Sequence, residues 1–174
     1  MKNRFLLTLL AAILSITYSM AQLSKTVHVS TPGTLSSLLG NDINRVSDLT
    51  LTGSINSTDF SILKSMSVLK NLDLKQVTLP NNTLPSNAFS HKKLEKIVLP
   101  NTLEIIEQSA FYESNITSID FSNCTNLHTI KTMAFAGMIG EGTLDFSKNS
   151  KLINFDQVLF GSVIKTVILP ENMK

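Results

Sequence analysis

Asp120 and Asp145 are the two residues of this sequence that could most directly form a pair able to bind a metal ion or share a proton. Each stands between two apolar residues of a repeated pattern, so we expect the two carboxylates on adjacent strands, roughly 5 Å apart. Such a pair could share a calcium ion or a proton, with further oxygens from Ser122 and Ser147. The alternative is a solvated ladder of charges, eased by Lys148 and salt. We favour the solvated ladder, because the strands offer no ligand-rich loop, and we expect no metal or other cofactor.

A cysteine and a histidine follow each other closely at Cys124 and His128, and they could form a nucleophile with its base. No third group is placed to orient the histidine, and Cys124 falls on a structural position of the repeat described below. His28 and His91 lie in other parts of the chain, so the three histidines share no face and a zinc site is not expected. The sequence has no Gly-rich phosphate loop. We therefore expect no catalytic activity.

The elements that position these residues are set by a repeated pair of apolar residues separated by one position. The pairs are Leu49/Leu51, Leu72/Leu74, Ile97/Leu99, Ile119/Phe121, Leu144/Phe146 and Val167/Leu169, at nearly constant intervals. A period of roughly 20–29 residues is typical of a leucine-rich-repeat solenoid, in which each coil buries its apolar side chains only against its neighbours. We predict an α/β-type, right-handed solenoid of about five to six coils, made mostly of short strands and coil, with an N-terminal cap.

Phenylalanine marks a second position of the repeat, eight residues after an apolar anchor. The pairs are Leu103 and Phe111, Leu127 and Phe135, and Leu152 and Phe160. Alanine precedes the phenylalanine at Phe89, Phe111 and Phe135, whereas Leu159 precedes Phe160. The spacing predicts that Phe160 holds the same place in its coil as the earlier phenylalanines, in a repeat that is degrading there.

Cys124 and Asn149 stand at matching places in two of the longer repeats. Leucine-rich repeats put a buried asparagine or cysteine at this position. The asparagine can satisfy backbone groups of the turn, and the cysteine behaves as a small buried apolar residue. A structural role is therefore predicted for both. Lys92 and Lys93 are interpreted as part of a solvated turn.

Two phrases carry a family resemblance: LEKIVLPNTL at residues 94–103 and IEQSAFY at residues 106–112. They resemble the repeat of the BspA-like leucine-rich-repeat family of bacterial surface proteins, and the similarity covers roughly residues 46–174. Members of that family are secreted or surface-bound, and several are implicated in adhesion to host matrix proteins or to other bacteria. The resemblance implies an exported binding protein of this kind, and it does not name a ligand.

The side chains that could carry function lie on the strand face opposite the core. Strand residues alternate, so the position between each apolar pair should point outward, and stacked coils should align these positions into rows. We expect the ligand-binding residues on this face, which we predict to be concave, to be Asp73, Lys96, Val98, Ser118, Asp120, Thr143, Asp145 and Ile168. The face is short-chained and mostly polar, which suits hydrogen bonding to a protein or a glycan.

The chain is predicted to consist of three segments, two that precede the repeats and one that contains them. Residues 1–21 are predicted to be a signal peptide, because Lys2 and Arg4 precede a short apolar run and Ser19-Met20-Ala21 suits a signal peptidase. Residues 22–45 are predicted to form the N-terminal cap, with a strand at 26–29 and a helical turn from Leu35 to Leu39. Residues 46–174 are predicted to be the solenoid. Its first repeat should carry a helix over 60–66 with Asp59 as N-cap.

The last coil is expected to lack a cap, which suggests a fragment, a truncated gene, or edge-to-edge association with a partner. Without Lys2 and Arg4 the chain keeps 13 of its 15 basic residues against 13 acidic ones. A net charge of zero gives no support for binding nucleic acid or anionic lipid, and no membrane span is expected after cleavage. We predict secretion or display at the outer cell surface and binding of a host or microbial macromolecule. The alternative is a non-catalytic structural or spacer segment of a longer surface protein.

Overall fold

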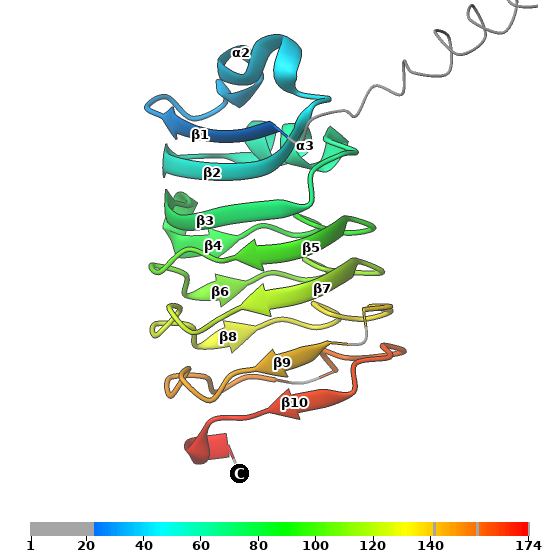
Figure 1. Ribbon diagram of the computed structural model, residues 1–174. Coiled ribbons are helices and arrows are strands. Elements are labelled where there is room, and N and C mark those ends of the chain that lie inside the picture. Colours follow the sequence, from blue (N-terminus) through cyan, green and yellow to red (C-terminus); the bar gives the residue numbers. More distant parts are fainter. Residues whose placement is uncertain (1–22, 141, 156, 174) are drawn as a thin grey trace, which may run out of the picture.

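The chain forms a column of stacked coils in the computed structural model, which describes residues 23–140, 142–155 and 157–173 (Figure 1). The predicted signal peptide, residues 1–21, lies outside the described residues. Within them, no helix is both long and apolar enough to cross a membrane.

Parallel strands form one side of the column, long in the upper coils and short in the last two, and the predicted apolar pairs fall on or next to them. Five strands make one sheet in the order β1-β2-β3-β5-β7, and two more, β9 and β10, pair with each other. Their bounds are β1 (Leu23–Val29), β2 (Val46–Ser54), β3 (Asn71–Thr78), β5 (Lys93–Val98), β7 (Asn115–Asp120), β9 (Thr143–Asp145) and β10 (Thr166–Ile168). The register places Leu49 beside Leu72, Leu72 beside Ile97, and Ile97 beside Ile119. The predicted strands and their alignment are therefore confirmed along this sheet.

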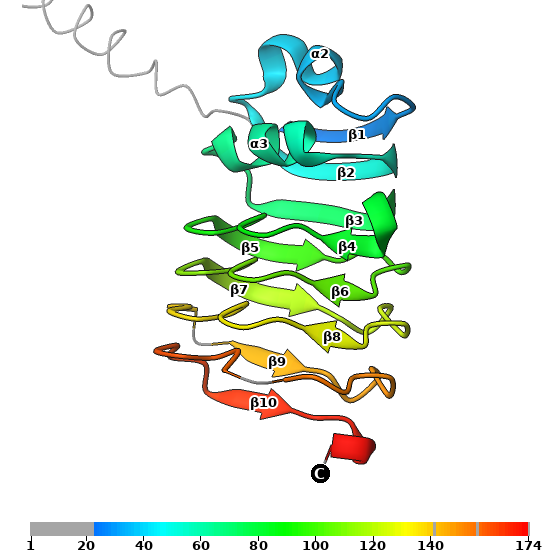
Figure 2. The ribbon, with the colours of Figure 1, turned by 180° about the vertical axis from the view of Figure 1, so that it is seen from behind.

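Short strands form the opposite side of the column (Figure 2). They are β4 (Thr83–Leu84), β6 (Ile105–Ile106) and β8 (Thr129–Ile130), in a parallel sheet of that order. The helices are α2 (Leu35–Leu39) and α3 (Ser57–Ser65), with 3-10 helices η1 (Gly40–Asp42), η2 (Pro80–Asn82) and η3 (Glu171–Met173). The predicted strand at 26–29 and the helix from Leu35 to Leu39 are confirmed.

Phenylalanine rings stack from coil to coil along the core. The rings of Phe89 and Phe111 lie 5.5 Å apart and those of Phe111 and Phe135 lie 5.1 Å apart, in nearly parallel planes. Phe60 of α3 meets Phe89 edge-on at 5.7 Å. All four rings are buried. Since each ring is covered by the equivalent ring of the next coil, burial depends on neighbours that are a full repeat away in sequence.

Helix α3 begins earlier than predicted, and Asp59 is not its N-cap. The N-cap is Asn56, whose side chain accepts a hydrogen bond from the Thr58 amide at 2.9 Å. Asp59 is the third helical residue and accepts from the Asn56 amide at 3.0 Å, which completes a capping box. The prediction was wrong because Asn56 and Asp59 are both good capping residues, and the box uses them together. The predicted buried face of Phe60, Leu63 and Met66 is confirmed.

The last coil is out of step with the predicted phenylalanine spacing. The Phe111 amide donates to the Ala134 carbonyl, and the Phe135 amide donates to the Val158 carbonyl. Leu159 therefore holds the phenylalanine place, and Phe160 is 73% exposed. The prediction for Phe160 was wrong because the segment from Leu152 to Val167 is one residue shorter than its counterpart from Leu103 to Ile119. The distance in sequence from Leu159 to Val167 equals that from Phe111 to Ile119. The missing residue therefore lies between Leu152 and Leu159.

The sheet of long strands is interrupted between β7 and β9. Gly140 and Gly142 lead into β9 and lie close to the backbone of β7. A Cβ atom on Gly140 would lie 2.4 Å from the Ile116 carbonyl oxygen, and one on Gly142 would lie 2.6 Å from that of Thr117. The chain enters β9 in close backbone contact with β7 instead of in a regular ladder, and β9 starts only at Thr143.

Candidate functional site

The outward face of the long strands consists of two rows of side chains that alternate with the buried apolar residues. The first row is Asp48, Asn71, Lys96, Ser118, Thr143 and Thr166, and the second is Thr50, Asp73, Val98, Asp120, Asp145 and Ile168. The register pairs these residues across β2, β3, β5 and β7 and again across β9 and β10. Every member of both rows is exposed or half-buried.

All eight residues predicted to bind a ligand lie on this outward face. Lys96, Ser118, Thr143, Asp145 and Ile168 are exposed, and Asp73, Val98 and Asp120 are half-buried. The alternation of strand side chains, read from the repeat, thus gives their orientation correctly. Their role in binding stays a prediction. The interruption after β7 separates the face into a part on β2, β3, β5 and β7 and a part on β9 and β10.

Three outward aspartates make the same local hydrogen bond: Asp120 and Asp145 end their strands, and Asp73 lies inside β3, where its pairing with β2 shifts register. Each carboxylate accepts a hydrogen bond from the backbone amide two residues later: Asp73 from Lys75 at 2.8 Å, Asp120 from Ser122 at 2.9 Å, and Asp145 from Ser147 at 2.8 Å. Such Asx turns stabilise the bends after β7 and β9, and the same bond in β3 supports the backbone at the register shift. The aspartates are therefore structural as well as accessible.

Hydrogen bonding keeps two of these carboxylates ionised. The Ser122 hydroxyl is the main cause that holds the pKa of Asp120 below its ordinary value, with further contributions from the Ser122 amide and from Lys96. The Ser147 amide, followed by the Ser147 hydroxyl, likewise lowers the pKa of Asp145. Both side chains are negative at neutral pH, so they offer a partner hydrogen-bond acceptors and negative charge.

We expected Asp120 and Asp145 to face each other on adjacent strands. The structure does not pair them in one ladder. Asp120 is paired with Val98 of β5, and Asp145 is paired with Ile168 of β10. Gly140 and Gly142 lie against the β7 backbone at this point, closer than a residue with a Cβ atom could, and β7 and β9 belong to different sheets. Among residues 23–140, 142–155 and 157–173, no three histidine, cysteine or acidic side chains are grouped closely enough to hold a metal ion. The calcium hypothesis gains no support from this arrangement.

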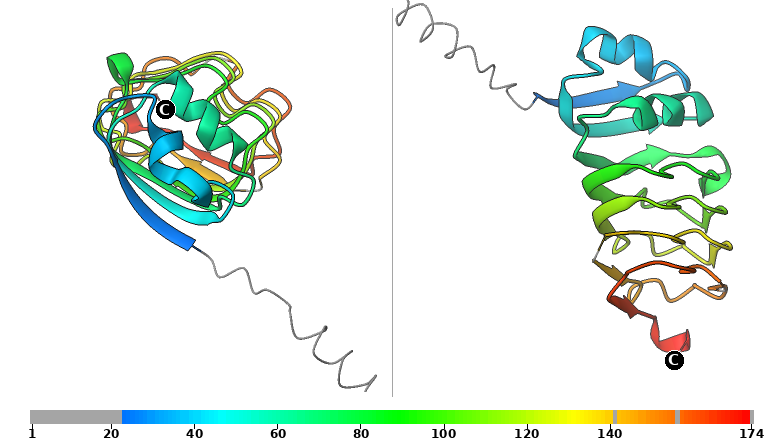
Figure 3. Two further views of the ribbon diagram at one scale, coloured as in Figure 1. Left: turned by 90° about the horizontal axis from the view of Figure 1, so that it is seen from above. Right: turned by 90° about the vertical axis from the view of Figure 1, so that its right-hand side faces the viewer.

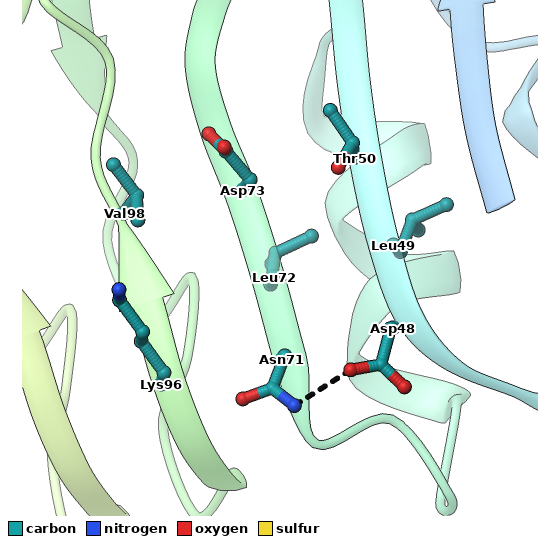
Figure 4. A pocket seen from close by; sticks show the side chains of 8 residues that line it. All are labelled: Asp48, Leu49, Thr50, Asn71, Leu72, Asp73, Lys96 and Val98. Atoms are coloured by element: carbon teal, nitrogen blue, oxygen red, sulfur yellow. Dashed lines mark hydrogen bonds between the residues drawn. The ribbon is translucent and has the colours of Figure 1, made fainter. Parts of the chain in front are cut away.

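A shallow hollow of about 230 Å³ lies on the upper part of the outward face (Figure 4). Its lining comes from β2, β3 and β5: Asp48, Leu49, Thr50, Asn71, Leu72, Asp73, Lys96 and Val98. The Asp48 carboxylate accepts from the Ser47 hydroxyl at 2.6 Å and from the Asn71 side-chain amide at 2.7 Å. The Ser47 hydroxyl and then the Asn71 amide lower the pKa of Asp48. Asp48, Thr50 and Asn71 were not among the predicted ligand-binding residues, although their places in the same rows could have indicated them.

Cys124 and Asn149 are buried, as predicted, and each bonds to the coil above. The Cys124 thiol donates to the Pro100 carbonyl at 3.3 Å. The Asn149 side-chain amide donates to the carbonyls of Phe121 at 3.2 Å and Cys124 at 2.7 Å. Burial is the main cause that raises the pKa of the Cys124 thiol to about 12, the opposite of what a nucleophile needs. The ring of His128 bonds instead to the Thr129 hydroxyl at 2.9 Å.

Lys92 is buried, so its interpretation as part of a solvated turn was wrong. Its ammonium donates to the Met66 carbonyl at 2.5 Å and to the Lys64 carbonyl at 3.5 Å, at the C-terminal end of α3. Burial lowers the pKa of Lys92 to about 8. Lys93 is exposed, as expected. The sequence misses this difference because the carbonyls that receive Lys92 belong to a helix of the preceding repeat.

Comparison with known protein families gives one match. The BspA type leucine rich repeat region matches residues 61–174, in six copies. A search of curated proteins found no match to the chain.

Proposed function

Because the chain belongs to the BspA type leucine-rich-repeat family, we propose that it is a secreted or surface-displayed binding module. Its partner is a protein or glycan of a host or microbial surface, and its contact region is the outward face. One observation carries the proposal: polar side chains continue in register across β2, β3, β5 and β7, directly over an apolar core. Binding rather than catalysis is the function that such a surface supports best.

The physical basis is a regular spacing of hydrogen-bonding groups. Paired parallel strands lie about 4.8 Å apart, so donors and acceptors on neighbouring coils are held at fixed separations. The outward side chains can differ between proteins without changing the core, because the repeat fixes only the inward positions. Four aspartates and one lysine lie in the two rows, a balance that disfavours a nucleic-acid phosphate backbone.

The proposal assigns no chemical step to the chain. Cys124 is closed off inside the core, with a thiol pKa of about 12. The histidines bond to different partners, since His28 contacts Thr52, His91 contacts Glu113, and His128 contacts Thr129. These contacts do not assemble a nucleophile, a base and an orienting group.

The test uses substitutions that alter the outward face without breaking its turns. Asp120 and Asp145 are poor choices, because their loss would also remove the turn hydrogen bonds to Ser122 and Ser147. The exposed pair Ser118→Arg and Thr143→Arg changes size and charge on the face instead. A matched control places the same two arginines on the opposite side of the column, at Gln108 and Thr132, which are also exposed.

Mature protein, residues 22–174, would be screened by biolayer interferometry against purified extracellular-matrix proteins, bacterial surface proteins and glycans. We expect at least a tenfold loss of affinity, about 1.4 kcal/mol, in the outward variant and a change within about twofold in the control. Equal losses in both variants would place the contact elsewhere on the column. Absence of binding by folded, monodisperse protein would reject the proposal and favour the non-catalytic spacer.

A further inference from the structure

A buried carboxylate joins helix α3 to the segment that lies above it. Asp59 is fully buried and accepts hydrogen bonds from three backbone amides. One belongs to Asn56, at the start of α3, at 3.0 Å. The other two belong to Gly33 at 2.6 Å and Leu35 at 3.0 Å. The three donors therefore lie in two segments that are far apart in sequence.

The loop before α2 is shaped to reach this carboxylate. Gly33 has a φ of +92°, in the region that favours glycine, and a Cβ atom there would meet the Asn56 side chain at 3.4 Å. The loop therefore sits directly on the start of α3. Seen from above, α2 lies over the interior of the coils (Figure 3). Its residues Leu35 and Leu39 are buried in the same cluster as Phe60 and Leu63 of α3.

We propose that Asp59 is a latch that closes the upper end of the column. The same carboxylate orders the start of α3 and holds residues 33–39 in place, so the two parts open and close together. Without it, these three amides lose their acceptor, and a donor left unsatisfied away from water is destabilising. The negative charge also stabilises the N-terminal end of α3. The strands β5 and β7 lie below the latch, and none of the three amides that bond to Asp59 belongs to them.

A contact just after this segment provides a control. Asp42 in η1 pairs with Lys25 of β1 at 2.6 Å and with Arg45 at 3.2 Å. The ion pair with Lys25 links η1 to the first strand and does not touch α3. Exposed ion pairs contribute little, so its loss should leave α3 unchanged.

Hydrogen-deuterium exchange of mature protein, read by mass spectrometry, tests the latch with three variants. Asp59→Asn replaces an acceptor oxygen by a donor. Gly33→Ala strains the loop and brings a Cβ atom against the Asn56 side chain. Asp42→Asn weakens the ion pairs with Lys25 and Arg45. We expect Asp59→Asn to speed exchange at least tenfold in residues 33–39 and 56–60 together, with no change in β5 and β7. Gly33→Ala should speed exchange at the start of α3 as well as in its own loop. Asp42→Asn should leave α3 unchanged.

Three results would overturn the proposal. They are faster exchange confined to one of the two segments in Asp59→Asn, equal acceleration in β5 and β7, and a Gly33→Ala effect that stays within the loop. If Asp59→Asn fails to fold, a Gly33→Ala effect that stays within the loop would still overturn the proposal, because the variant leaves the carboxylate in place. Binding by the outward face is a separate readout, so failure of the latch and failure of the proposed function are distinguishable.

Discussion

The coils of β2, β3, β5 and β7 and the coils of β9 and β10 use the same repeat with different regularity. The upper strands are long and pair in one ladder with β1, whereas β9 and β10 are short and, among the described residues, form a separate two-stranded sheet. Exposed large apolar side chains are Leu38 and Val68 above, and Ile139, Ile153, Phe160, Val163 and Ile168 below. A solenoid thus keeps its overall stacking where the repeat weakens, but it loses strand pairing and side-chain burial.

Two local departures from the repeat explain the difference. Gly140 and Gly142 bring the chain close to the β7 backbone and delay the start of β9. One residue too few before Leu159 moves Phe160 out of the phenylalanine position. Since each coil is covered by its neighbours, a single shift changes several contacts at once.

The largest expected difference in stability between the upper and lower coils concerns the phenylalanine position. Phe111→Ala in the upper coils should lower the free energy of unfolding by about 3–5 kcal/mol, because a fully buried ring is replaced by a cavity. Phe160→Ala should change it by no more than about 0.5 kcal/mol, because its ring is exposed. Urea denaturation of both variants measures the difference. Similar losses would show that Phe160 packs in the core after all.

The next effect concerns Lys92, which gives the upper coils a dependence on pH. Burial lowers the folded-state pKa from 10.5 to about 8, so between these values the unfolded chain holds a proton that the folded chain has released. Stability contributed by this lysine therefore rises as pH increases from 8 to 10.5, by on the order of 3 kcal/mol, and this contribution is absent below pH 8.

Urea denaturation at pH 7 and pH 10 checks this dependence in the wild type and in Lys92→Met. The variant should lack the rise that the wild type shows. Lys93→Met is the matched control, because its lysine is exposed and its loss should leave the wild-type rise in place. The same pH dependence in wild type and Lys92→Met would contradict the burial of this ammonium.

The smallest expected effect is a gain in stability when the last coil is given the phenylalanine spacing of the upper coils. Replacing Leu159 by Phe and Phe160 by Ala restores the phenylalanine of the earlier coils and extends the ring stack beyond Phe135. Ring pairs contribute about 0.5–1.5 kcal/mol beyond their buried area, so a gain of that size is expected. Thermal unfolding measures it, with Phe160→Ala alone as the control. A loss of stability would show that the coil has no room for the larger ring.

Much of the outward face was predictable, because strand alternation is a local property. Lys96 and Val98 point outward because they flank Ile97, and Ser118 and Asp120 do so because they flank Ile119; both isoleucines are buried. The turn role of the aspartates was missed, although an aspartate followed by a bend is itself a signal for an Asx turn. The hollow beside Asp48 was also missed, because it depends on the register between β2, β3 and β5.

The solenoid, the inward and outward positions of the long strands, and the burial of Cys124 and Asn149 could all be predicted from the sequence. These follow from the period of the repeat and from alternation within strands. Three features could be seen only in the folded chain: Lys92 reaches the end of α3, Asp59 bonds to the loop at Gly33, and Phe160 lies outside the core. The physical reason is that these three outcomes depend on which backbone groups of a neighbouring coil or helix lie within reach, and spacing along one coil does not specify them.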